Sequence, residues 1–217
     1  MFGIQDLTLF ILSGLLLNMA PGPDSVLIMT RSATQGWRAG SAAALGIAAG
    51  TCVHVLAAAL GLSALLATSA WAFTLIKYLG AAYLIYLGLT MLLRRTAQPQ
   101  TATATATASS SPAPLSRRKI FTQGFLSNAL NPKVALFFLA FVPQFIAPDA
   151  PNKALAFVVL GIIFNINSLL WCHALALFTA LASRRLRLSA RVTSGLNQGI
   201  GALFLAFGIK LALARVA

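Results

Sequence analysis

Six long apolar runs constrain the fold of this chain more than any other feature. Each run has at least the ~20 residues that an α-helix needs to cross the hydrocarbon core of a bilayer. Backbone polar groups in that core must be hydrogen-bonded within their own segment, so each run is predicted to be a helix. The apolar/polar alternation of a membrane β-barrel is absent. The six predicted spans are Leu7–Met29, Gly40–Leu66, Ala70–Leu93, Ile120–Ile146, Ala154–Ala182 and Gly195–Ala214.

The composition agrees with this interpretation. Only 9% of the 217 residues are charged and the mean hydropathy is +0.85, whereas a soluble domain carries about 25% charged residues. The sequence therefore predicts an all-α polytopic membrane protein. Its formal net charge of +13 does not indicate a nucleic-acid partner, because the basic residues lie between apolar runs. Cys52 and Cys172 fall inside such runs, which argues against a disulfide framework.

The distribution of basic residues predicts the orientation in the membrane. The second loop contains no Lys or Arg, and the fourth contains only Lys153. Because cytoplasmic loops carry an excess of Lys and Arg, we expect the odd-numbered loops in the cytoplasm and both termini outside. If the first segment did not cross fully, the N-terminus would lie inside and the third loop would stay cytoplasmic. The basic residues of the odd-numbered loops are Arg31, Arg38, Arg94, Arg95, Arg117, Arg118, Lys119, Arg184, Arg185, Arg187 and Arg191.

The third loop separates two similar halves. It contains TATATATASSSPAP at residues 101–114, which lacks large apolar residues and is interpreted as disordered. On either side of it, GAAYLIY (residues 80–86) resembles GALFLAF (residues 201–207). Three spans repeated by three spans place the halves in opposite orientations, as in many secondary transporters. The predicted units are a first three-helix repeat at 1–95, a disordered cytoplasmic linker at 96–118 and a second three-helix repeat at 119–217.

Both halves interrupt their first span with proline. PGPD lies at residues 21–24 in the first span, and NPK lies at residues 131–133 in the fourth. Proline lacks an N–H and clashes with the preceding turn, so each span is predicted to break into two half-helices. Non-helical backbone is tolerated at membrane depth only where it is buried in protein or lines a cavity. The two breaks therefore predict a cavity between the halves, where helix N-termini could bind a substrate carboxylate.

One charged side chain follows each break. Asp24 lies in the first turn of its half-helix, where the dipole favours an anion, and one interpretation is local stabilisation of that helix end. Lys133 has the same place in the other half, where the dipole opposes a cation. Lys133 therefore needs a partner, which could be Asp24, a substrate carboxylate or water. Ionisable residues within membranes are costly, so the other interpretation is that this pair takes part in transport.

Other polar residues in the spans are weaker signals. Thr51 and His54 share a face of the second span, and Asn165 lies on a polar face of the fifth. Each could simply hydrogen-bond a neighbouring helix. The small-residue face of Gly46 and Gly50 could serve packing within the chain or in a homodimer. The candidate binding and transport residues are Asn18, Pro21, Gly22, Pro23, Asp24, Thr51, His54, Asn128, Asn131, Pro132, Lys133 and Asn165.

The motif PGPD, the run GAAYLIYLG and the segment NPKVALFFLAFVPQFI together resemble the LysE/RhtB-type (lysine exporter / homoserine-threonine exporter) family of bacterial amino-acid exporters. The resemblance covers nearly the whole chain. It implies a transporter of the bacterial inner membrane that exports amino acids or close derivatives by antiport with protons. It also assigns functional roles to residues 21–24 and 131–133. Many family members have Asn in place of Asp24, so the resemblance alone does not give Asp24 a proton role.

Two other function classes are weighed against an exporter of amino acids. A soft-metal exporter could use the donors Cys52, His54, Cys172 and His173, although their spacing differs from that of paired zinc ligands. An enzyme is not expected, because no HExxH, GxSxG or comparable motif is present, and no cofactor is expected. Beyond Asp24 no span contains an acid, so small neutral substrates such as threonine or homoserine are favoured over cationic ones.

Overall fold

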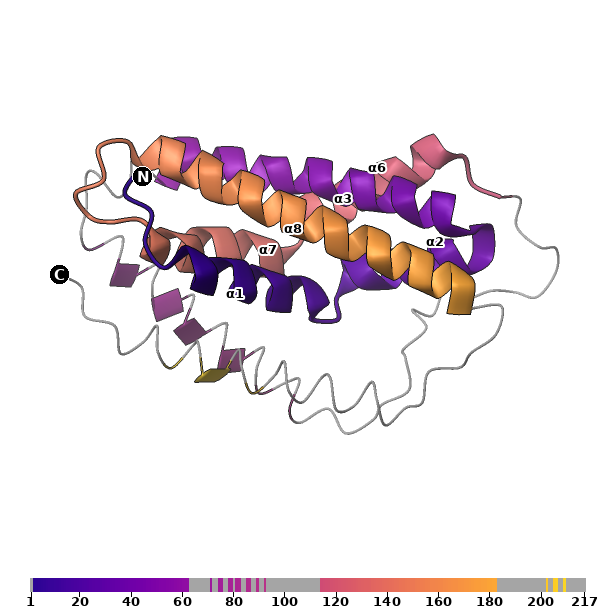
Figure 1. Ribbon diagram of the computed structural model, residues 1–217, viewed down its shortest axis with the longest axis horizontal. Coiled ribbons are helices and arrows are strands. Elements are labelled where there is room, and N and C mark those ends of the chain that lie inside the picture. Colours follow the sequence, from indigo (N-terminus) through magenta and orange to yellow (C-terminus); the bar gives the residue numbers. More distant parts are fainter. Residues whose placement is uncertain are drawn as a thin grey trace.

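The computed structural model describes residues 2–62 and 114–182, together with scattered helical positions between 71 and 92 and between 202 and 209. In the two long stretches the chain is helical apart from loops and an isolated bridge between Ile4 and Ile146 (Figure 1). The elements are α1 (Leu7–Met19), α2 (Pro23–Gln35), α3 (Trp37–Ala57), the π-helical η1 (Ala58–Leu62), α6 (Arg117–Ala129), α7 (Pro132–Leu136), the π-helical η2 (Phe137–Phe141), the 3₁₀-helical η3 (Val142–Phe145) and α8 (Lys153–Ala182).

Within the part of the chain that the structure describes, two continuous helices are long and apolar enough to cross a membrane, namely Trp37–Gly61 and Lys153–Ala182. Two bent helix pairs, α1 with α2 and α6 with α7 to η3, meet the same criterion together. The chain is therefore an all-α polytopic membrane protein. The third and sixth predicted spans and residues 96–113 of the predicted linker lie outside the continuously described residues.

The first and fourth spans are broken, as the two proline motifs predict. The helix axis turns by 58° between α1 and α2, and by 45° between α6 and the segment that begins with α7. Ala20 and Gly22 are extended at the first break, and Asn131 is extended at the second. Pro23 and Pro132 then start the next half-helix, where the missing N–H is no loss because it would have no helical partner.

Helices α3 and α6 pack backbone to backbone through glycine. A Cβ on Gly46 would collide with the carbonyl oxygen of Phe121, and one on Gly124 would collide with that of Ala43. A Cβ on Gly50 would stand 2.8 Å from the carbonyl oxygen of Phe125. The small-residue face of α3 thus serves packing within the chain, because close approach of two membrane helices requires small side chains.

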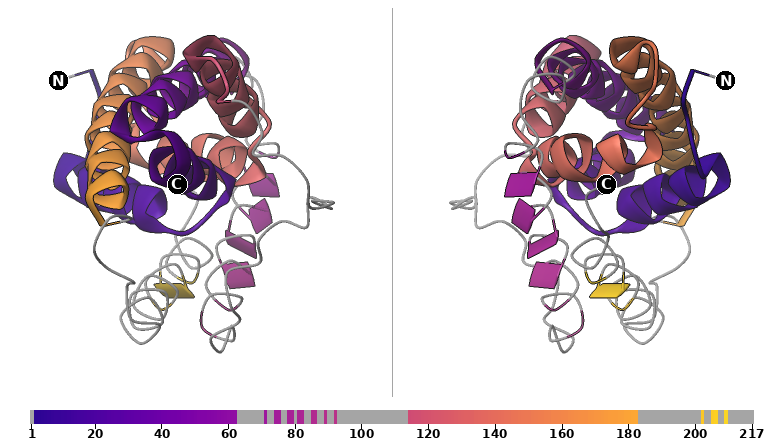
Figure 2. Two further views of the ribbon diagram at one scale, coloured as in Figure 1. Left: turned by 90° about the vertical axis from the view of Figure 1, so that its right-hand side faces the viewer. Right: turned by 90° about the vertical axis from the view of Figure 1, so that its left-hand side faces the viewer.

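Two apolar clusters lie on either side of a polar layer along α3. Ala43, Ala44 and Ile47 belong to a cluster with residues of α2, α6 and α8. Val55 and Ala58 belong to a second cluster, which is rich in phenylalanine from α1, η2 and α8. Thr51 and His54 lie between these two groups and are both buried. The end-on views in Figure 2 show α3 between α6 and α8, the helices with which it makes its most extensive contacts.

Candidate functional site

Asp24 is held by three side chains from the other half of the chain. Its Oδ1 accepts a hydrogen bond of 2.6 Å from the Ser127 hydroxyl. Its Oδ2 accepts bonds from the amide groups of Asn128, at 2.8 Å, and Asn131, at 3.0 Å. Hydrogen bonds to an ionised acceptor are roughly twice as strong as neutral ones. The carboxylate thus joins the N-terminus of α2 to the second break, more than 100 residues away in sequence.

Lys133 is held by backbone carbonyls at the end of α1. Its Nζ donates to the carbonyl oxygens of Leu17, at 3.0 Å, and Ala20, at 3.1 Å. These carbonyls belong to the last turn of α1 and its C-cap, where the helix dipole is negative and the chain break removes their helical partners. These two carbonyls are partners that the sequence does not suggest for Lys133, beside the three it leaves open, namely Asp24, a substrate carboxylate and water. These carbonyls are free to accept a hydrogen bond from Lys133 because the first span breaks after them.

Each break therefore binds the charged residue that follows the other break. The half-helix after the first break carries Asp24, which is bound at the second break, and the half-helix after the second break carries Lys133, which is bound at the first. Figure 1 shows α1 and α7 together toward one end of the bundle, with α2 and α6 toward the other. The four half-helices thus meet at one level of the bundle. At this level the end of each half-helix contributes polar groups.

The two half-helix N-termini differ in how they are capped. The side-chain oxygen of Asn131 accepts a hydrogen bond of 3.0 Å from the backbone N–H of Lys133, which caps α7. No side chain caps α2, whose N-cap residue is Gly22. A Cβ on Gly22 would lie 3.3 Å from Nζ of Lys133, so the ammonium group stands directly beside this uncapped end. An uncapped N-terminus beside an ammonium group can bind an anion.

Three further candidate residues converge on this level. Asn128 Oδ1 accepts a bond of 3.2 Å from the Thr51 hydroxyl. His54 Nε2 lies 2.9 Å from the carbonyl oxygen of Asn128; a carbonyl can only accept, so Nε2 carries the hydrogen. The His54 ring stacks on Phe138 with centroids 6.3 Å apart. The second span thus positions Asn128 through both its side chain and its backbone.

Two other candidates leave a buried polar atom without a partner. Nδ2 of Asn18 is buried and makes no hydrogen bond with any other described residue. Asn165 donates to the carbonyl of Ala48, at 3.1 Å, and to Sγ of Cys52, at 3.4 Å, but its Oδ1 is buried and unpaired. Most buried polar side-chain atoms have a partner, so these two amides carry unused hydrogen-bonding capacity inside the bundle.

The four soft-metal donors are not brought together. Cys52 lies on the outside of α3 beside Asn165, and His54 is engaged with Asn128. Cys172 is buried near Ser168, and His173 bonds the Leu169 carbonyl one turn back on its own helix. All four positions are described, and no group of three His, Cys, Asp or Glu side chains suited to a metal ion occurs among the described residues.

Ser127 is a site residue that the sequence reasoning missed. It lies one position before Asn128, and its hydroxyl makes the shortest of the three bonds to Asp24. Its only sequence signal is a polar residue within one turn of a predicted break. That signal is common in membrane helices, and only the folded chain shows that this hydroxyl faces a carboxylate.

Comparisons with known proteins identify the family of the chain. Residues 15–215 match the family described as LysE type translocator. An uncharacterized membrane protein of Pseudomonas aeruginosa is 35% identical over 217 residues, covering 99% of this chain and 98% of the relative. The homoserine/homoserine lactone efflux protein of Salmonella typhi is 30% identical over 211 residues, covering 95% of each chain. No solved structure matches at a significant level. The chain belongs to the LysE type translocator family.

Proposed function

We propose that this translocator is a secondary active exporter of amino acids or close derivatives, located in the bacterial inner membrane and driven by exchange with protons. The efflux protein of Salmonella typhi, 30% identical, is named for homoserine and homoserine lactone, which supports a substrate of that size and charge. The observation that carries the proposal is the uncapped N-terminus of α2 beside the ammonium group of Lys133.

The substrate carboxylate binds at the first break in this proposal. Backbone N–H groups in the first turn of α2 point toward the break, and Lys133 adds a positive charge. Two of its three N–H donors are used by the carbonyls of Leu17 and Ala20, which leaves one for the substrate. Gly22 keeps this space open, because any side chain there would contact Nζ of Lys133. Asn18 offers an unpaired amide donor near the same end of α1.

Small neutral amino acids fit this site better than cationic ones. A cationic side chain would require an acid, and Asp24 is the only acidic residue within the predicted spans. Both of its oxygens already accept hydrogen bonds. Threonine and homoserine instead carry a hydroxyl group, which the unpaired Nδ2 of Asn18 near the end of α1 could bind.

Asp24 carries the transported proton in this proposal. Protonation turns three charge-assisted hydrogen bonds into neutral ones, which are roughly half as strong. The carboxylate joins α2 to the second break, so uptake of a proton weakens the contact between the two halves. Proton binding would then favour opening at this contact, which couples it to the alternating access expected of a transporter with inverted repeats.

Proteoliposomes test this function directly. Wild-type protein should show counterflow of labelled threonine or homoserine and faster efflux when a pH gradient is imposed. Asp24→Asn should keep exchange but lose the acceleration, because an amide cannot titrate while its oxygen can still accept from Asn128 and Asn131 and its NH₂ can donate to Ser127. Lys133→Ala should lose both, whereas the control Lys153→Ala, at the start of α8, should lose neither.

Three results would contradict the proposal. Absence of counterflow for every neutral amino acid and for homoserine lactone would reject the exporter function or its substrate class, and counterflow of cadmium or zinc instead would favour the soft-metal alternative. Gradient-driven efflux at the wild-type rate in Asp24→Asn would remove Asp24 as the proton carrier. Normal exchange in Lys133→Ala would remove the proposed carboxylate site at the first break.

A further inference from the structure

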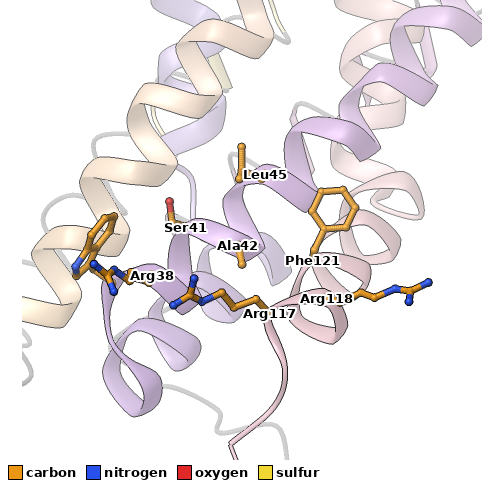
Figure 3. Close-up of a pocket in the computed structure, with 8 residues that line it drawn as sticks. Arg38, Ser41, Ala42, Leu45, Arg117, Arg118 and Phe121 are labelled. Atoms are coloured by element: carbon orange, nitrogen blue, oxygen red, sulfur yellow. The ribbon is translucent and has the colours of Figure 1, made fainter.

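A pocket of about 510 Å³ lies between the starts of α3 and α6, at the end of the bundle where the basic loops begin (Figure 3). Its basic residues are Arg38 on α3 and Arg117 and Arg118 on α6. In Figure 3 the side chains of Arg38 and Arg117 extend toward the same side of the pocket, whereas that of Arg118 extends away. Trp37, Leu45 and Phe121 supply apolar walls. This pocket is separate from the site formed by Asp24 and Lys133.

The pocket concentrates positive charge that no acidic side chain of the described residues neutralises. Arg38 lies in the first turn of α3, Arg117 and Arg118 in that of α6, and neither turn contains an acid. Helix dipoles make both N-termini positive, so they oppose these cations and favour an anion. The chain has only three acidic side chains. Asp24 is bound within the polar layer, Asp6 precedes α1, and Asp149 precedes α8.

The walls of the pocket show what kind of anion fits. Trp37 is 50% exposed, Leu45 51% and Phe121 38%, so apolar surface continues from the guanidinium groups along the outside of α3 and α6. The guanidinium carbon of Arg38 lies 5.7 Å from the Trp37 ring centroid, an arrangement typical of an interfacial anchor. A soluble anion would gain nothing from these apolar walls. An acyl chain attached to the anion would cover them.

We propose that this pocket binds an anionic phospholipid of the cytoplasmic leaflet. The phosphate group lies between Arg38 and Arg117 at the two helix N-termini, and one acyl chain runs along Leu45 and Phe121. Because α3 and α6 are joined tightly through Gly46 and Gly124, a lipid bridging their starts also reinforces the contact that positions Asn128. Basic pockets between membrane helices on the cytoplasmic side are known to bind anionic headgroups.

Short-chain phosphatidylglycerol, added to the purified full-length protein in a neutral detergent, tests the proposal. Bound lipid is counted by native mass spectrometry, and thermal unfolding is followed by scanning fluorimetry. We expect saturable binding to wild type and an affinity about 30-fold lower in the double variant Arg38→Gln/Arg117→Gln. This factor follows from a loss of about 1 kcal/mol for each basic residue removed. The matched control Arg184→Gln/Arg185→Gln removes two charges from another loop predicted from the sequence and should change binding less than threefold.

Further binding measurements distinguish an anionic lipid from a soluble anion. Phosphatidylcholine and inorganic phosphate should neither stabilise the wild-type protein nor compete with phosphatidylglycerol. Leu45→Ser should weaken binding of phosphatidylglycerol while leaving both arginines in place. Equal losses in the two double variants would overturn the proposal in favour of a diffuse effect of loop charge. Competition by inorganic phosphate at similar concentrations would overturn it in favour of a soluble anion.

Discussion

Gly50→Ala tests how tightly the polar layer depends on the contact between α3 and α6. An added Cβ would lie 2.8 Å from the Phe125 carbonyl oxygen and 2.9 Å from both the Ala129 nitrogen and the Asn128 Cβ, whereas ordinary contacts begin at 3.4 Å. All three atoms are fixed by the backbone of α6, so a rotamer change cannot relieve the overlap. The helices must therefore separate by about half an ångström, and overpacking of this kind costs about 1–3 kcal/mol.

The same displacement moves Asn128 away from its partners. Its hydrogen bonds to Asp24, at 2.8 Å, and from His54, at 2.9 Å, would lengthen toward the limit of about 3.2 Å for an N–H···O bond. Gly61→Ala is the matched control, because an added Cβ there meets nothing within 4 Å. Unfolding in mixed detergent micelles should show a loss of about 1–3 kcal/mol for Gly50→Ala and less than about 0.5 kcal/mol for Gly61→Ala. Equal stability of the two variants would refute the reasoning, and so would unchanged proteoliposome exchange in a destabilised Gly50→Ala.

Three other predictions concern the site and the topology. Lys133→Met should lower the free energy of unfolding in micelles by about 1–3 kcal/mol, because the α1 carbonyls lose their donor. Lys133→Arg should restore little transport, since the guanidinium group is larger and directs its donors differently. Full transport by Lys133→Arg would contradict a specific ammonium site. The double variant Cys52→Ser/Cys172→Ser should exchange amino acids at near-normal rates in proteoliposomes, and loss of exchange in folded protein would revive the soft-metal alternative. A cysteine introduced by Ser110→Cys should resist impermeant thiol reagents in intact cells, and labelling from outside would reverse the predicted orientation.

Much of the architecture is predictable because it follows from local chemistry. The length of the apolar runs predicts helices that cross a bilayer, and the structure has them at 37–61 and Lys153–Ala182. The breaks at residues 21–23 and at Asn131–Pro132 were predictable because proline removes a helical hydrogen bond at its own position. The cap provided by Asn131 was predictable for the same reason, since a cap bonds a backbone N–H only two residues away.

The partners of the charged residues were not predictable in this way. The sequence places Asp24 and Lys133 at equivalent positions and leaves Asp24, a substrate carboxylate and water as possible partners of Lys133. In the structure, Lys133 bonds to carbonyls 113 and 116 residues away, and Asp24 to side chains of the other half. Opposite charge is a weak guide here, because backbone carbonyls released by a helix break are equally good partners for an ammonium group. A helix break leaves backbone carbonyls without helical partners, and these acceptors cannot be recognised from the identity of the side chains.

The sequence by itself determined that this is a membrane protein of helices, where two of those helices break, and which residues carry charge into the apolar core. The tertiary structure decided that the breaks meet, that each binds the charged residue of the other, and that the glycine face of α3 packs on α6 rather than on a second copy of the chain at that contact. The physical reason is the range of the interactions. Helix length, proline breaks and caps depend on neighbours within one or two turns, whereas the polar layer depends on which helices touch, and that is settled by packing over the whole bundle.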